Sequence, residues 1–350
     1  MILLQTKIFL ELHGFMSMTH SAIAWNFWSG FKRLLMLLIE INSQQFELLK
    51  EECSFWDQKV TEILIKEKFP STDMRRFHYG ANIVYSFGGN QFVIKLFPKH
   101  LNEQFTIELE VLTILEGKIK IVDTPRLVNY GSFEGWNYLI MTQLHGELLI
   151  DIWDRLTNDE KEKLSKDLGK TIKEFHEVPI TRLKQLPSNW NGFIQKQFKN
   201  MKHYHLNMEL NANLYSDLDY YVEEKYININ PEKKLLTGEY TPFNLLLNER
   251  NGKWQLTGVI DFADCFLGDG DYDLLGPIMF MFNSNQKHIK HFLESYGFPK
   301  IQVNYVLQKK LMTYTILHRF SNINYFASQN QQAKLATNFN ELARILIPIS

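Results

Sequence analysis

Three oxygen-bearing side chains stand close together in the second half of the chain. Glu239 and Asn244 lie in the stretch 236–244, which reads LTGEYTPFN, and Asp261 follows an apolar run a little further on. A carboxylate, an amide and a second carboxylate could orient a hydroxyl group and hold a cation against a phosphate chain. This combination of residue types indicates phosphoryl transfer.

Lys95 and Glu108 form a second pair of candidate residues. Lys95 lies in a predicted strand, residues 92–97, whose other side chains are apolar on both faces, and Glu108 lies in the apolar stripe of a predicted helix, residues 101–115. A carboxylate buried without a partner would cost several kcal/mol, so we expect an ion pair between the two. The alternatives are a lysine whose ammonium group reaches solvent and a glutamate at the edge of the stripe.

The elements that must position these residues change in character along the chain. Strands are predicted over 82–87 and 91–97, around a turn at Gly88-Gly89-Asn90, and again over 126–132 and 136–141. Helices are predicted over 43–68 and 101–115, and helical periodicity dominates after residue 145, most clearly over 158–176. A chain of 350 residues favours two lobes, because single cores seldom exceed about 250 residues. We therefore expect a small antiparallel sheet with one helix, followed by a larger helical domain.

Composition excludes several classes of protein. Apolar residues make up 45% and charged residues 22% of the chain, and the net charge of −1 gives no support for a nucleic-acid surface. Cys53 and Cys265 match neither a disulfide framework nor a metal-ligand spacing, which favours the cytoplasm. Residues 1–40 are interpreted as an extension, with Met36 as a possible start of the fold. Polar residues dilute its uncharged run too strongly for a membrane span.

The order of these motifs resembles that of the aminoglycoside phosphotransferase and choline kinase family, which shares the protein-kinase fold. The likeness covers residues from about 75 to 280. The family's catalytic loop usually reads His-Gly-Asp with an Asn five residues after the Asp, whereas this chain has Thr237-Gly238-Glu239 and then Asn244. The spacing is kept, but two residue types differ.

The resemblance implies a bilobal α+β fold with an N-terminal extension (1–40), an N-lobe (41–144) and a C-lobe (145–350). It also implies ATP and Mg²⁺ as cofactors. In the N-lobe, the ATP site would comprise a loop over the phosphates (Gly80 and Asn82), a phosphate-binding pair (Lys95 and Glu108) and an adenine-reading hinge (Thr142, Gln143 and Leu144). In the C-lobe, Glu239 would take the position of the catalytic aspartate, Asn244 and Asp261 would bind the metal, and Asp273 would brace the catalytic loop.

The activity implied is transfer of the γ-phosphate of ATP to a hydroxyl of a small molecule resembling an aminoglycoside, choline or a sugar. A nucleotide-binding pseudokinase with little transfer activity is the main alternative, because the extra methylene of Glu239 moves its carboxylate by about 1.5 Å. A third interpretation of the sequence is that the phosphate acceptor is a protein side chain. Several acidic residues could form an acceptor-binding rim or serve as caps and solvated faces: Asp217, Asp219, Glu223, Glu224, Asp264, Asp269 and Asp271. The sequence leaves the oligomeric state open.

Overall fold

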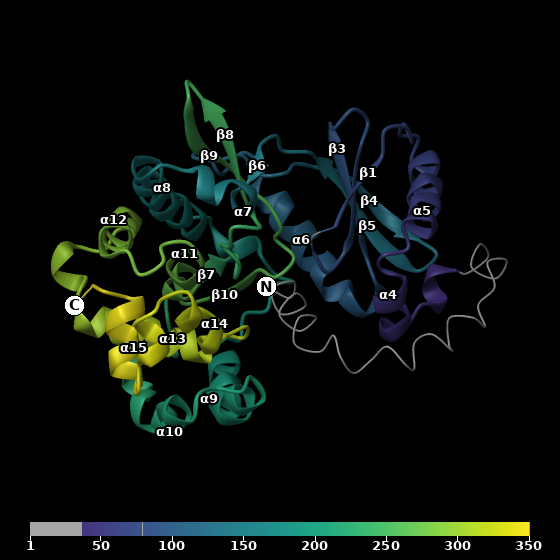
Figure 1. The fold of residues 1–350 in the computed structure, drawn as a ribbon. Coiled ribbons are helices and arrows are strands. Elements are labelled where there is room, and N and C mark those ends of the chain that lie inside the picture. The colour runs from purple at the N-terminus through teal and green to yellow at the C-terminus, as the bar shows by residue number, and fades with distance from the viewer. Residues whose placement is uncertain (1–36, 79, 350) are drawn as a thin grey trace. The chain divides into compact units, whose positions relative to one another are not determined.

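The structure is a computed structural model that describes residues 37–78 and 80–349. Expectations about residues 1–36, including Met36 as a start, lie outside the described residues. The chain forms two compact units, one of Met1–Thr113 with Pro125–Leu144 and one of Ile114–Thr124 with His145–Ser350 (Figure 1). The second segment of the first unit ends at Leu144, and the segment Ile114–Thr124 falls within the second unit.

A five-stranded antiparallel sheet of order β1-β2-β3-β5-β4 is the centre of the first unit. Its strands are β1 (Arg75–Phe77), β2 (Ile83–Phe87), β3 (Phe92–Phe97), β4 (Leu127–Phe133) and β5 (Trp136–Thr142). The predicted hairpin is confirmed: β2 pairs with β3, and the turn residues Gly88, Gly89 and Asn90 all have positive φ. The short strand β1 is not evident from the sequence pattern.

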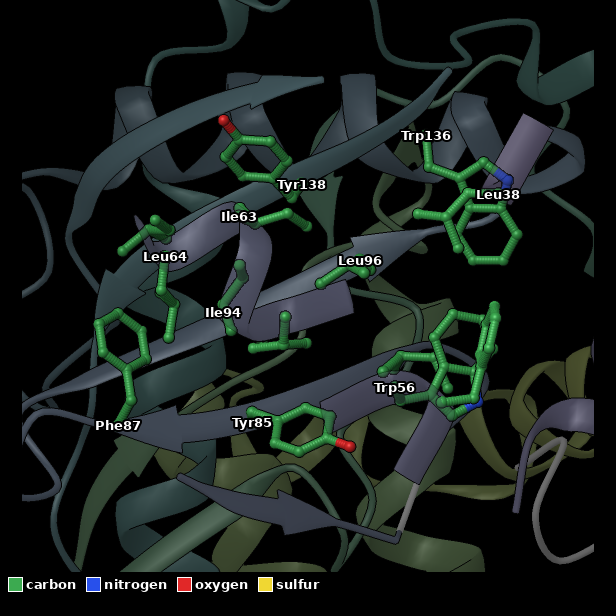
Figure 2. Close-up of a cluster of buried hydrophobic side chains, with 14 of the residues drawn as sticks. Leu38, Trp56, Ile63, Leu64, Tyr85, Phe87, Ile94, Leu96, Trp136 and Tyr138 are labelled. Atoms are coloured by element: carbon green, nitrogen blue, oxygen red, sulfur yellow. The ribbon is translucent and has the colours of Figure 1, made fainter. Parts of the chain in front are cut away.

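Helices α4 (Ser43–Leu49) and α5 (Cys53–Lys66) supply the core on one face of this sheet. Their aromatic residues meet alternate residues of the strands, and Figure 2 shows Trp56 close to Trp136, with ring centroids 5.5 Å apart. Leu38, from the short 3-10 turn Leu38–Glu40, is fully buried in the same cluster. The expected extension therefore contributes to the fold at its last residues.

Helix α6 (Asn102–Leu115) lies against the face of β3 that carries Lys95 and Phe97. The ring of Phe97 contacts that of Phe105 at 5.6 Å. Because successive strand residues point to opposite faces, Ile94 and Leu96 join the cluster under α4 and α5 while Lys95 points toward α6.

The second unit is mainly helical. Its helices are α7 (Leu149–Ile152), α8 (Asn158–His176), α9 (Trp190–Asn207), α10 (Ala212–Tyr221), α11 (Leu275–Phe280), α12 (Gln286–Tyr296), α13 (Tyr305–Leu317), α14 (Ile323–Ser328) and α15 (Phe339–Leu346), with 3-10 turns between several of them. Helices α8 and α12 lie side by side (Figure 1). A Cβ at Gly169 of α8 would stand 2.4 Å from the Phe292 carbonyl oxygen, so only glycine permits this approach.

Two small antiparallel sheets complete the second unit. One has the order β6 (Glu147–Leu148), β8 (Leu245–Arg250) and β9 (Lys253–Val259), and the other pairs β7 (Lys234–Leu236) with β10 (Phe266–Gly268). Asn251 and Gly252 have positive φ and form the turn between β8 and β9. None of the described helices meets the length and hydropathy needed to cross a membrane.

Candidate active site

The loop of residues 237–244 begins where β7 ends and leads into β8. Its first turn is held through the main chain, because the amide groups of Thr237 and Gly238 donate to the two carboxylate oxygens of Asp273 at 2.9 and 2.8 Å. Asp273 is buried in the 3-10 turn Gly270–Leu274. The structure thus contains the brace between Asp273 and the loop that the resemblance implies.

His176 and Tyr296 extend this brace, and sequence reasoning missed the role of both. Nε2 of His176 lies 3.1 Å from the Asp273 carboxylate, and Nδ1 lies 2.9 Å from the Tyr296 hydroxyl. The arrangement is satisfied when His176 donates to the carboxylate and accepts from the tyrosine. Asp273, His176 and Tyr296 come from three different elements, so no local pattern reveals the contact; a histidine ending the apolar stripe of α8 was the only signal.

Asn244 and Asp261 are brought together by main-chain pairing. The Ile260 amide donates to the Asn244 carbonyl at 3.0 Å, which sets Asp261 one residue beyond the point of contact. Nδ2 of Asn244 donates to the Glu239 carbonyl at 3.1 Å, so its Oδ1 is the side-chain atom left to ligate a cation. Magnesium prefers one or two oxygen-bearing protein ligands together with phosphate and water, and this amide–carboxylate pair fits that preference.

Asp261 has an unusual backbone conformation, with φ of +67° at the end of β9. Aspartate is among the few non-glycine residues that enter this left-handed region readily. Its Oδ1 accepts from the Ala263 amide at 3.4 Å. A strained residue of this kind is retained where its surroundings hold it, often at functional sites.

Glu239 is half-buried at the centre of the loop. Its amide donates to the Thr237 hydroxyl oxygen at 3.5 Å, a contact within the loop. Burial, reinforced by the carboxylates of Asp264 and Asp261, raises the pKa of Glu239 to about 7. A carboxyl group with this pKa can exchange a proton near neutral pH.

The expected ion pair is present in the first unit. Nζ of Lys95 lies 2.7 Å from Oε2 of Glu108, and both side chains are buried. The ammonium group also lies 5.3 Å from the centre of the Phe97 ring. A lysine held in this way presents a fixed positive charge at the surface of the sheet under α6.

The other predicted site residues of the first unit lie just before β2 and at the end of β5. Gly80 has a φ of +112°, and Asn82 is buried and contacts Gln104 of α6 at 3.4 Å. In the expected hinge, the amides of Thr142 and Gln143 donate to the carbonyls of Arg126 and Gln91 at 2.9 and 2.8 Å. These two amides are therefore occupied by main-chain pairing within the first unit.

The acidic residues considered for an acceptor-binding rim are engaged in internal contacts. Lys310 binds Asp269 at 2.9 Å and Asp271 at 2.5 Å, and the Tyr314 hydroxyl donates to Asp269 at 2.7 Å. Burial, with Asp269 nearby, raises the pKa of Asp271. Asp269 is buried and Asp271 is partly buried.

The acidic residues around α10 are also paired with neighbouring groups. Asp217 accepts from the Phe339 amide at the start of α15, Asp219 binds Lys202, and Glu223 binds Lys225. They form a helix cap and surface ion pairs, and these contacts account for them without a cationic acceptor.

A small antiparallel sheet followed by a larger helical part is an α+β, protein-kinase-like fold, and together with the family match it makes the protein a phosphotransferase of the kinase type. The chain belongs to the phosphotransferase enzyme family, whose sequence model matches residues 80–300, more than half of the chain.

Solved structures and a curated protein provide further comparisons. The complex of APH(2'')-IIIa with GDP and kanamycin is similar over 79% of this chain and 97% of that one, with 20% identity and a TM-score of 0.63. The streptomycin–ATP–APH(2'')-IIa ternary complex matches over 74% and 90%, with 18% identity and a TM-score of 0.54. The lysine-specific demethylase JMJ21 of Arabidopsis thaliana is 22% identical over 242 residues, 58% of this chain, and the match spans only 26% of that protein.

Proposed function

We propose that the protein transfers the γ-phosphate of ATP to a hydroxyl of a small molecule in a magnesium-dependent reaction. The observation that carries this proposal is the loop of residues 237–244, braced by Asp273, in which Glu239 and Asn244 stand beside Asp261 through the pairing of Ile260. Phosphoryl transfer depends mainly on positioning and on electrostatic stabilisation, and a rigid loop of oxygen ligands supplies both.

In the first unit, Lys95 binds the α- and β-phosphates and Glu108 keeps its ammonium group in place. Gly80 and Asn82 belong to the loop over the phosphates, and the Leu144 amide is the hinge donor that reads the adenine edge. The buried ion pair supports these assignments, since a fixed cation is what a phosphate chain requires.

In the second unit, Oδ1 of Asn244 and the carboxylate of Asp261 would hold the magnesium ion, which would neutralise charge on the nucleotide phosphates. Glu239 orients the acceptor hydroxyl and takes up its proton. Its pKa of about 7 suits a group that must accept a proton near neutral pH.

Magnesium-dependent ATP turnover in the presence of a pool of small alcohols tests this function. Asp261→Asn should abolish turnover and Glu239→Gln should lower it strongly, whereas Asp154→Asn, a change of the same type at an exposed site, should leave it unchanged. Each variant should unfold at nearly the temperature of the unmodified protein.

A nucleotide-binding module with little transfer activity is the second candidate, and the replacement of His-Gly-Asp by Thr-Gly-Glu is the feature that favours it. Thermal stabilisation by ATP and magnesium without turnover would select this candidate. Absence of any nucleotide effect would contradict both candidates.

The kanamycin and streptomycin complexes of similar structures support a small-molecule acceptor, as opposed to a protein side chain. We further place the protein in a reducing compartment, the cytoplasm. Neither Cys53 nor Cys265 forms a disulfide within the described part of the chain, in keeping with that assignment.

A further inference from the structure

Arg319 lies directly against the loop that carries Glu239. It follows helix α13, and a Cβ added to Gly238 would stand 2.6 Å from its Nη2. Gly238 has a φ of +73°, so glycine is required here both by the backbone and by the arginine. The guanidinium group is therefore in contact with the residue that precedes Glu239.

The guanidinium group of Arg319 is held in one place by its surroundings. It lies over the rings of Phe266 and Phe320, each at 4.9 Å, and its Nη2 donates to the Asp264 carbonyl at 2.9 Å. The Arg319 amide donates to the Tyr272 hydroxyl at 3.0 Å. An arginine fixed in this way loses little further side-chain freedom when it binds a ligand.

Most of the hydrogen-bonding capacity of this arginine is unused in the described part of the chain. A guanidinium group has five N–H donors. One bond to the Asp264 carbonyl is present, the nearest oxygen of the Asp264 carboxylate is 3.8 Å away, and the buried Nε has no partner among the described residues. A buried donor left unpaired is costly, so the guanidinium group favours a further hydrogen-bond acceptor beside it.

We propose that Arg319 is an acceptor-binding residue and that the alcohol phosphorylated by this protein carries an oxyanion, a carboxylate or a phosphate, which the Arg319 guanidinium binds beside Glu239. This inference rests on the proposed function and narrows its acceptor. The planar fork of arginine matches both oxyanions, and its fixed positive charge disfavours an ammonium group at the same place. Three of the acidic residues considered for a cationic acceptor, Asp217, Asp219 and Glu223, are already paired.

Equilibrium binding of matched small alcohols tests the inference, with the protein saturated by magnesium and a non-hydrolysable ATP analogue. The probes are glycerol, choline, kanamycin, glycerate and glycerol 3-phosphate. We expect glycerate or glycerol 3-phosphate to bind at least about tenfold more tightly than glycerol, choline or kanamycin, because a hydrogen bond to a charged group contributes about 1.5–3 kcal/mol. Arg319→Gln should remove this preference, and Arg319→Lys should retain part of it.

Arg344→Gln, at an exposed position on α15, is the matched control and should leave the preference intact. Arg319→Lys keeps most of the aliphatic stem against Phe266 and serves if Arg319→Gln fails to fold. The inference is wrong if the wild type shows no preference for the anionic probes, or if neither variant of Arg319 alters it. It is also wrong if the variants weaken binding of the ATP analogue instead, because the oxyanion would then belong to the nucleotide.

The proposed function is judged separately from this inference. Magnesium-dependent ATP turnover that is lost in Asp261→Asn supports the function whatever the probes show. Absence of such turnover would remove the function even if Arg319 bound the anionic probes.

Discussion

Glu239 carries one methylene more than the aspartate that the family resemblance places at this position. The amides of Thr237 and Gly238 hold this loop to Asp273, and the backbone adopts a left-handed conformation at Gly238, with a φ of +73°. If this loop is adapted to glutamate, Glu239→Asp withdraws the carboxylate by about 1.5 Å. We expect kcat to fall about 100-fold, with the thermal unfolding temperature unchanged.

Steady-state kinetics of Glu239→Asp at saturating ATP provide the measurement. Asp154→Glu, the reverse exchange at an exposed position, should leave kcat unchanged. Equal or higher activity in Glu239→Asp would show that the loop keeps the geometry of an aspartate site, and the adaptation argument would fail.

His205 predicts an effect of pH on stability. It is fully buried, and its Nε2 donates to the Ile316 carbonyl of α13 at 2.9 Å. Burial lowers the pKa of His205 below its ordinary value of 6.5, so the unfolded chain binds a proton more readily than the folded one. The stabilisation from neutral His205 is therefore complete above pH 6.5 and is lost as the pH falls toward the pKa of the folded state.

Urea denaturation at pH 8 and pH 5.5 measures this effect. His205 should contribute a loss of at most about 1.4 kcal/mol in unfolding free energy between the two pH values, the limit set by its ordinary pKa of 6.5. In His205→Gln that part of the pH dependence should disappear, whereas His203→Gln, at an exposed position on the same helix, should retain it. The same pH dependence in both variants would show that His205 is not the titrating group.

Residues on periodic elements could be predicted from the sequence, and isolated polar residues could not. The Lys95–Glu108 pair follows from an alternating strand and a helical stripe, each of which constrains where a side chain points. Arg319 contacts Asp264, 55 positions earlier, and His176 contacts Asp273, 97 positions later. Such contacts depend on how distant elements pack, and neither residue type signals its partner.

At the scale of elements, α8 and α12 stabilise the loop through the chain of Tyr296, His176 and Asp273. Loss of the imidazole would leave the carboxylate of Asp273 with fewer donors and loosen its hold on two loop amides. In His176→Ala we expect hydrogen exchange at Thr237 and Gly238 to accelerate about tenfold or more, since a hydrogen bond to a charged group contributes about 1.5–3 kcal/mol.

Mass spectrometry of peptides covering residues 237–244 reports this exchange. His203→Ala should leave it unchanged, because His203 is exposed on α9. A merely space-filling role for His176 would lower global stability without a selective effect on the loop, and uniform acceleration across all peptides would therefore contradict a positioning role.

Hairpins were the elements most accessible to sequence reasoning. Gly88-Gly89-Asn90 and Asn251-Gly252 carry the left-handed conformations that tight turns need, and both hairpins are present. The helix predicted over 43–68 is instead two helices, α4 and α5, separated at residues 50–52. Apolar spacing continues across this break because both helices cover the same core, so periodicity alone does not reveal it.

At the scale of the whole molecule, the residues just before α4 belong to the first unit. Leu38 is fully buried in its core, and its amide donates to Glu134 at 2.8 Å, whereas its neighbour Ile39 is 51% exposed. We expect Leu38→Ala to lower the unfolding free energy by about 2–5 kcal/mol, the usual cost of a buried leucine.

Chemical denaturation of Leu38→Ala and Ile39→Ala compares the two positions within one turn. Ile39→Ala should change stability by less than about 1 kcal/mol. Similar values for both variants would place residues 37–40 outside the cooperative core, as the sequence analysis assumed when it assigned residues 1–40 to an extension.

The brace at Asp273 has a consequence for how this enzyme family can change. The carboxylate binds the main-chain amides of residues 237 and 238, so the side chain at 237 can vary, whereas the positive φ at 238 favours glycine. Mutations that exchange histidine for threonine, or aspartate for glutamate, can therefore accumulate without undoing the turn itself. Substitutions that change the chemistry of the loop can therefore arise while its main-chain turn is retained.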